Sequence, residues 1–182
     1  MSVLIEKKLA SQIVYKGRII NLRLDEVELP NGKKGQREVV EYNGAVAVVA
    51  LNRDREVLMV RQFRYAVEEV LLEIPAGKIN EGEDPEISAR RELGEETGHE
   101  ASEWMHLTSF YSTPGFTTEK LYVYLASGLK SGQQHTDEDE FIQVESYPLE
   151  KVLSMIDHGE IKDAKSIVGL LAAKRYFDGN KC

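Results

Sequence analysis

The chain has 182 residues, 42% of them hydrophobic and 30% charged, which suits one domain with a sizeable core and room for an added subdomain. Its 31 acidic residues against 23 basic ones give a net charge of −8, which argues against nucleic acid as a partner because a phosphate backbone is bound by a basic surface. The single cysteine, Cys182, excludes an internal disulfide and fits a reducing compartment.

The first forty or so residues have the pattern of β-structure. Apolar residues alternate with polar ones from Leu22 to Leu29, and Pro30-Asn31-Gly32 supplies a turn into residues 36–42. We therefore expect an N-terminal antiparallel β extension over residues 1–43. Because a small free-standing sheet is only marginally stable, we expect it to pack on a second subunit and make a homodimer.

The second predicted domain spans residues 44–182 and begins with the longest apolar run of the chain. This run, Ala45–Leu51, predicts a core strand and is far too short to span a bilayer. Glu6, Lys7 and Lys8 interrupt what would otherwise begin a signal peptide. We therefore expect a cytoplasmic protein with no membrane partner.

The rest of the second domain alternates strands and helices. Further strands are predicted at Glu56–Gln62, Glu69–Glu73, Trp104–Tyr111, Lys120–Ala126 and Phe141–Tyr147. Apolar stripes at helical spacing predict two C-terminal helices, one ending before Gly159 and one before Gly179. A mixed sheet with helices on both faces is the economical arrangement of these elements, so the predicted fold class is α/β.

An acidic helix is predicted between the second and third of these strands. Asp84 can cap its start, Pro85 suits its first turn, and Gly98 can end it. Glu92 and Glu96 lie four residues apart and therefore share one face of the helix. Like charges at this spacing repel each other, which a bound cation would relieve.

The acidic face of this helix adjoins its apolar stripe. Ala89 and Leu93 also lie four residues apart, so packing them inward carries the carboxylates toward the body of the protein. Arg91 precedes Glu95 by four residues and can hold that carboxylate, which leaves the other two for a cation. Oxygen ligands of this kind suit Mg²⁺, or Mn²⁺. The alternative is an ordinary solvated face, which normally lies opposite the apolar stripe.

Residues 77–98 resemble the Nudix box, G-x5-E-x7-R-E-U-x-E-E-x-G-U, in which U is a bulky aliphatic residue. His99 stands where the pattern has its last aliphatic residue, a position that packs and does not bind metal. The resemblance implies an α/β/α sandwich and Mg²⁺-assisted hydrolysis of a nucleoside diphosphate derivative. The matching positions are Gly77, Glu83, Arg91, Glu92, Leu93, Glu95, Glu96 and Gly98.

A second string resembles the ADP-ribose pyrophosphatase subfamily. Thr113-Pro114-Gly115 is followed by Glu119, and Pro114 lies sixteen residues after Gly98. An ordinary turn is the alternative, since Pro-Gly makes turns in many settings. The resemblance implies hydrolysis of ADP-ribose to AMP and ribose 5-phosphate.

The resemblance also implies the residues that bind the metal and activate water. Glu138 matches the general base, although the variable loop length leaves open an exchange of roles with Glu140. Without the resemblance, this acidic segment would be read as a solvated loop. The implied metal ligands are the backbone carbonyl of Ala76 with Glu92, Glu96 and Glu140, and the implied catalytic residues are Glu138, Glu95 and Arg91.

The substrate-binding residues are implied in the same way. Arg64 matches an arginine that contacts the diphosphate, and guanidinium groups suit such oxygens. Thr113, Pro114, Gly115 and Glu119 border the ribose side. Arg37 and Glu38 match residues that reach the adenosine portion across a dimer interface, with an exposed β pair as the alternative.

Other functions stay open at this point. A Nudix hydrolase can prefer a nucleotide sugar, a dinucleotide or an oxidised nucleoside triphosphate. A non-catalytic nucleotide sensor on the same fold is a further alternative, which the intact box disfavours. A calcium-binding module would need the D-x-[DN]-x-[DN]-G spacing, which the sequence lacks.

Overall fold

The computed structural model describes residues 4–136 and 140–179, which fall into two compact units. The N-terminal unit contains the chain up to Gly44 together with Tyr111–Lys120. The larger unit contains Ala45–Phe110 and the chain from Leu121 onward. The structure thus groups with the N-terminal residues a segment that lies far along the chain.

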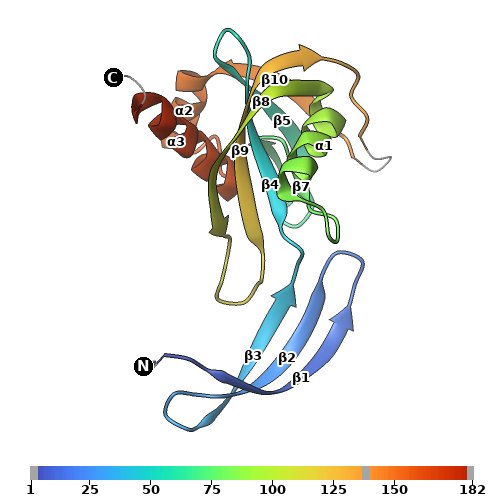
Figure 1. Ribbon diagram of the computed structural model, residues 1–182, viewed down its shortest axis with the longest axis vertical. Coiled ribbons are helices and arrows are strands. Elements are labelled where there is room, and N and C mark those ends of the chain that lie inside the picture. Colours follow the sequence, from blue (N-terminus) through green and yellow to red (C-terminus); the bar gives the residue numbers. More distant parts are fainter. Residues whose placement is uncertain (1–3, 137–139, 180–182) are drawn as a thin grey trace. The chain divides into compact units, whose positions relative to one another are not determined.

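The N-terminal unit is built on an antiparallel sheet in the order β1-β2-β3 (Figure 1). Its strands are β1 (Lys7–Lys16), β2 (Asn21–Glu28) and β3 (Lys34–Glu41). The predicted turn between β2 and β3 forms around Gly32, whose φ of 80° favours glycine. The segment 111–120 joins the end of β3, because Val40 donates to the carbonyl of Phe116 and accepts from the N–H of Thr118.

The larger unit is built on a mixed sheet (Figure 1). Within the described residues this sheet has seven strands, and its main path runs β10-β5-β4-β9-β8. Strand β4 is parallel to β9, while β5 pairs antiparallel with β4, β6 and β10, and β7 pairs antiparallel with β4. The strands are β4 (Ala45–Leu51), β5 (Glu56–Arg64), β6 (Glu69–Glu73), β7 (Ala76–Lys78), β8 (His99–Tyr111), β9 (Lys120–Ser131) and β10 (Gln143–Pro148).

Helices cover both faces of this sheet. Helix α1 (Pro85–Thr97) lies on one face, and α2 (Leu149–Asp157) and α3 (Ala164–Gly179) lie on the other (Figure 1). Every residue of β4 is buried, and alternate side chains enter the two cores. Val48 packs on the α1 side and Val49 on the α2 and α3 side. The predicted mixed sheet between helical layers is confirmed.

The predicted start and end of the acidic helix are confirmed as well. Asp84 is the N-cap, and its Oδ1 accepts the N–H of Glu86 at 2.8 Å. Gly98 is the C-cap in the left-handed region, with a φ of 67°. Other bounds differ from the predictions: β8 begins earlier, β10 begins at Gln143, and the short strand β7 was not predicted.

None of the described helices is long and apolar enough to cross a membrane.

Candidate metal and diphosphate site

Helix α1 directs its acidic face into the larger unit. Leu93 is fully buried, and this anchors the helix so that the neighbouring Glu96 is only 3% exposed. Oε2 of Glu96 accepts the backbone N–H of Ala76 in β7 at 2.8 Å. Burial raises the pKa of Glu96 to about 8, with a further increase from the charge of Glu92. A protonated acid or a bound cation would satisfy this carboxylate.

Glu92 lies one turn earlier on the same face and against the backbone of Gly77. A Cβ at residue 77 would overlap the carboxylate of Glu92, so glycine is required for this approach. Burial also raises the pKa of Glu92, although the hydrogen bond from Arg91 opposes this. Gly77 therefore leaves room for the carboxylate of Glu92, and both residues belong to the Nudix box.

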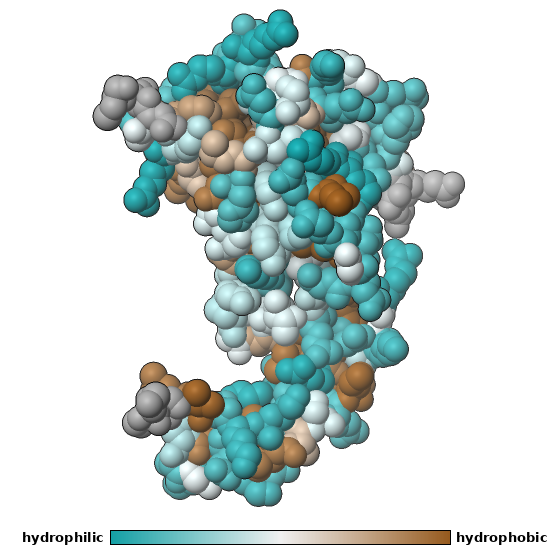
Figure 2. Space-filling model, viewed as in Figure 1, coloured by the Kyte–Doolittle hydropathy of each residue, from teal (hydrophilic) through white to brown (hydrophobic). Residues whose placement is uncertain are grey.

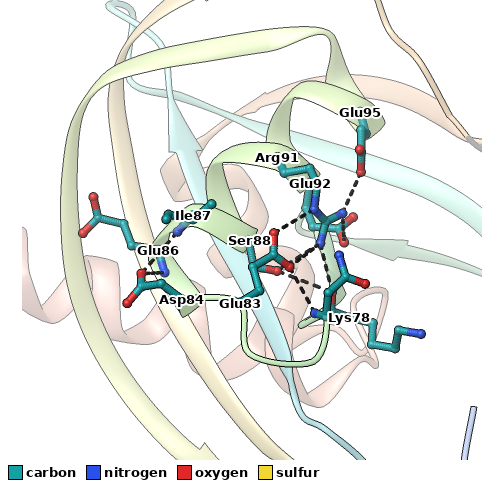
Figure 3. A network of polar contacts seen from close by, with 10 residues as sticks. Lys78, Glu83, Asp84, Glu86, Ile87, Ser88, Arg91, Glu92 and Glu95 are labelled. Carbon is teal, nitrogen blue, oxygen red and sulfur yellow. Dashed lines mark hydrogen bonds and ion pairs between the residues drawn. The ribbon is translucent and has the colours of Figure 1, made fainter.

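Arg91 clamps three acids of the box (Figure 3). Its Nη1 donates to Glu95 at 2.8 Å and to Oε1 of Glu92 at 2.7 Å. Its Nε and Nη2 donate to the two oxygens of Glu83, both at 3.1 Å. The prediction that Arg91 holds Glu95 is confirmed. The same guanidinium nitrogen also donates to Glu92, a contact that the helical spacing did not predict.

Glu83 fixes the other end of this network. Its Oε2 accepts the N–H of Asn80 at 3.0 Å, and the hydrogen bonds from Arg91 lower its pKa to about 2. Nη2 of Arg91 also donates to the carbonyl of Lys78 at 3.1 Å, next to Gly77 in β7. The arginine thereby ties the start of α1 to the strand that faces Glu92 and Glu96.

The donors gathered here fit a hard divalent ion. Glu92 and Glu96 offer buried carboxylates beside the backbone of Ala76, and both have raised proton affinity in the metal-free protein. Across residues 4–136 and 140–179, three or more His, Cys, Asp or Glu side chains do not converge as a ready-made metal cage. Paired carboxylates of this kind are the oxygen ligands that divalent ions such as Mg²⁺ and Mn²⁺ prefer.

Glu140 follows the acidic loop and acts on the same carboxylates through its charge. This charge contributes to the raised pKa values of both Glu92 and Glu96. Glu138, the predicted general base, lies outside the described residues.

Arg64 ends β5 in the larger unit and is held by Glu73. Its Nε and Nη2 donate to the two oxygens of this carboxylate at 2.8 and 2.7 Å. The hydrogen bonds that Arg64 donates to Glu73 are the main cause of its raised pKa, and the charge of Glu96 adds to it. Arg64 therefore lies within electrostatic range of Glu96 in α1.

The other predicted substrate residues belong to the N-terminal unit. Arg37 in β3 is exposed and pairs with Glu6, to which its Nε donates at 2.9 Å. Glu38 is exposed beside it. The carbonyl of Thr113 accepts the N–H groups of Phe116 and Thr117, both at 3.2 Å, so the Pro114-Gly115 pair forms a turn. Glu119 closes this loop, since its carbonyl accepts the N–H of Ser112 at 3.3 Å.

Two residues that support the site were missed by the sequence analysis. Glu73 is fully buried, and Lys165 from α3 donates to its carboxylate. A charged residue at the end of an apolar strand was the available signal for Glu73. Lys165 left no such signal, because its partner lies 92 residues away in the chain.

Known proteins resemble this chain over most of its length. The chain matches the NUDIX domain over residues 41–168 and the nucleoside diphosphate sugar hydrolase N-terminal domain over residues 6–40. It is 44% identical over 168 residues to an ADP-ribose pyrophosphatase of Bacillus subtilis, covering 91% of each chain. It is also 41% identical over 167 residues to the methanol dehydrogenase activator of Bacillus methanolicus, covering 91% of this chain and 90% of that one.

The fold has a solved counterpart. A crystal structure described as an ADP compounds hydrolase superposes with a TM-score of 0.88, covering 100% of this chain and 98% of the other at 22% identity. The capped acidic helix, the match over residues 41–168 and the Bacillus subtilis relative together show that this chain belongs to the Nudix family of pyrophosphohydrolases.

Proposed function

We propose that the chain hydrolyses ADP-ribose to AMP and ribose 5-phosphate with the help of Mg²⁺. The observation that carries this proposal is the 44% identity to the Bacillus subtilis ADP-ribose pyrophosphatase across 91% of both chains. The charges of the larger unit support it, because the cationic guanidinium of Arg64 and the buried carboxylate of Glu96 influence one another.

Nudix hydrolases generally depend on a divalent metal, and we propose that Mg²⁺ serves here, with Mn²⁺ as a substitute. Its ligands would be Glu92, Glu96, Glu140 and the backbone carbonyl of Ala76. When bound, such an ion neutralises a diphosphate and lowers the pKa of a water molecule.

Side chains activate the water molecule and orient the substrate. Glu138 takes the proton of the attacking water, because carboxylates that bind a cation lose proton affinity and make poor bases. Arg91 keeps Glu92 and Glu95 in fixed orientations through its two hydrogen bonds from Nη1. Arg64 orients the diphosphate, so that water attacks a phosphorus atom and the bridging P–O bond breaks.

The N-terminal unit would complete substrate recognition. We propose that Thr113, Pro114, Gly115 and Glu119 border the ribose and that Arg37 and Glu38 reach the adenosine portion of a substrate bound to the other subunit of a dimer. Support comes from the turn at Pro114-Gly115, which the structure joins to the end of β3, the strand that carries Arg37 and Glu38.

The test is a substrate panel in water enriched in ¹⁸O. With ADP-ribose and Mg²⁺ we expect AMP and ribose 5-phosphate, one of them carrying the label on its phosphate, and no turnover after chelation. GDP-mannose, a dinucleotide and an oxidised nucleoside triphosphate are compared at equal concentration. A kcat/KM for any of these about tenfold above that for ADP-ribose would reject the proposed substrate.

A nucleotide sugar is the second candidate substrate. The match of residues 6–40 to a nucleoside diphosphate sugar hydrolase N-terminal domain favours it. The same panel separates the two candidates, since GDP-mannose releases GMP whereas ADP-ribose releases AMP.

We also propose that the chain acts as a cytoplasmic homodimer joined through its N-terminal unit. All ten residues of β1 are exposed, including Leu9 at 41%, Ile13 at 57% and Tyr15 at 58%. Brown, apolar atoms are accordingly visible on the surface of this sheet in Figure 2. Burying such side chains against a second copy would remove apolar surface from water.

Light scattering after size-exclusion chromatography tests the dimer. We expect the wild type to have twice the mass of one chain, as a dimer, and Ile13→Glu to have the mass of one chain, as a monomer. Lys33→Glu, at the exposed turn between β2 and β3, is the control that stays dimeric. A monomeric wild type would refute this part of the proposal.

A further inference from the structure

Glu73 is a buried carboxylate shared by two cations from distant parts of the chain. Its side chain is 1% exposed. Arg64 donates to both of its oxygens, at 2.8 and 2.7 Å, and Nζ of Lys165 donates to Oε2, the oxygen that Nη2 of Arg64 also uses. Burial alone would raise the pKa of Glu73, but the two cations outweigh burial and hold the pKa below its ordinary value. The carboxylate therefore stays charged.

Lys165 is itself held in place by the first turn of α3. Its Nζ lies 3.0 Å from Oδ1 of Asp163, and the other oxygen of Asp163 accepts the N–H and hydroxyl of Ser166 at 2.9 and 2.6 Å. The hydroxyl oxygen of Ser166 accepts the N–H of Ile74, the residue after Glu73, at 2.9 Å. The start of α3 thus binds both the side chain of Glu73 and the backbone beside it.

The contacts of Glu73 determine which N–H groups of Arg64 are left to bind an anion and how much of its positive charge is neutralised. Glu73 occupies the Nε–Nη2 edge of the guanidinium, so Nη1 and the second N–H of Nη2 remain as its donors on a side chain that is 40% exposed. Because Lys165 also donates to Oε2, the carboxylate of Glu73 neutralises the charge of Arg64 less completely than it would if Arg64 were its sole partner. Lys165 therefore affects both the orientation of Arg64 and its attraction for an anion.

We propose that Lys165 is a positioning residue that acts through Glu73 to aim Arg64 at the diphosphate of the substrate. This inference rests on the proposed function, in which Arg64 contacts that diphosphate. It makes the first turn of the C-terminal helix part of the machinery that sets substrate affinity.

Lys165→Met is the first test, with Lys162→Met as its matched control. Lys162 also pairs with a glutamate of β6, Glu69, at 2.6 Å, but both side chains are about half exposed, at 58% and 49%. For Lys165→Met we expect KM for ADP-ribose to rise about fivefold with kcat within about twofold, because binding of the ground and transition states weakens together. Lys165→Arg should restore KM. Equal KM values for the two methionine variants would overturn the proposal.

A double-mutant cycle with Glu73→Gln separates action through Glu73 from a general loss of structure. Once the shared charge is gone, Lys165→Met should change KM by less than about twofold. The neutral amide also avoids leaving an unpaired buried carboxylate in the double variant, so the fold is preserved. Independent, multiplicative effects of the two substitutions would overturn the proposal.

An activity-independent measurement distinguishes failure of this inference from failure of the proposed function. Hydrogen exchange of the Arg64 Nε proton, followed by NMR, should be slower in Lys165→Met, because Glu73 then pairs with Arg64 alone, and unchanged in Lys162→Met. A wild type that does not hydrolyse ADP-ribose rejects the proposed function, while this exchange still reports on Arg64. Unchanged exchange in Lys165→Met rejects the positioning role.

Discussion

The carboxylate of Glu92 occupies the space in which residue 77 would carry a Cβ, so Gly77 and Glu92 form a close pair of backbone and acid. The pair joins β7 to α1, the two elements that also meet through Ala76 and Glu96. The carboxylate of Glu92 can therefore lie in this position only because residue 77 is glycine.

Gly77→Ala should displace Glu92 and weaken metal binding. We expect kcat/KM for ADP-ribose to fall on the order of 100-fold, as for other displaced groups around a metal, and the Mg²⁺ requirement to rise. Kinetics over a Mg²⁺ titration measure both. Gly94→Ala is the control, because its Cβ would meet nothing within 4 Å and alanine favours a helix by about 1 kcal/mol. Equal activity of the two variants would contradict this account.

Glu96→Gln should abolish most activity while the protein stays folded. The amide oxygen can still accept the N–H of Ala76, but the charge that attracts the ion is gone. A fall in kcat of about 100-fold or more is expected, with circular dichroism unchanged. Glu86→Gln, on the exposed side of the same helix, should keep wild-type activity. Near-native turnover in Glu96→Gln would refute the metal role.

Two carboxylates of the box should give the metal-free protein opposite pH dependences. Folding raises the pKa of Glu96 from 4.5 to about 8, so the folded state keeps a proton that the unfolded chain releases. The free energy of unfolding should therefore decrease as pH rises through this range. Folding lowers the pKa of Glu83 from 4.5 to about 2, so its stabilising contribution is present above 4.5 and is lost as pH falls toward 2.

Urea denaturation in the presence of EDTA measures both effects. Glu96→Gln should reduce the loss of stability above pH 4.5, and Glu83→Gln should reduce the loss below it. A curve for Glu96→Gln that parallels the wild type at neutral pH would show that Glu96 is ionised in the folded metal-free protein.

Two residues of the acidic loop should have different roles, with Glu138 as the general base and Glu140 as a metal ligand. Glu138→Gln should lower kcat by about 10²-fold or more with little change in the Mg²⁺ requirement, as expected for a lost general base. Glu140→Gln should mainly raise the Mg²⁺ requirement, because its charge acts on both Glu92 and Glu96. If Glu138→Gln lowers kcat little while Glu140→Gln abolishes activity, the base is assigned to the wrong residue.

The sequence determined the local features of this protein. Asp84, Pro85 and Gly98 predicted the bounds of α1, because caps act over three or four residues. The apolar run Ala45–Leu51 predicted the central strand with its bounds. The spacing of Arg91 and Glu95 predicted their contact, since residues four apart are neighbours on a helix.

Tertiary structure decided the features that depend on contacts between distant segments. The hydrogen bond from Arg91 to Glu92 depends on side-chain conformation that helical spacing does not fix. The pairing of Lys165 with Glu73 spans 92 residues, and the segment 111–120 joins the N-terminal unit by bonding to β3. Such contacts leave no periodic signal in the chain, because each depends on how separately formed elements pack.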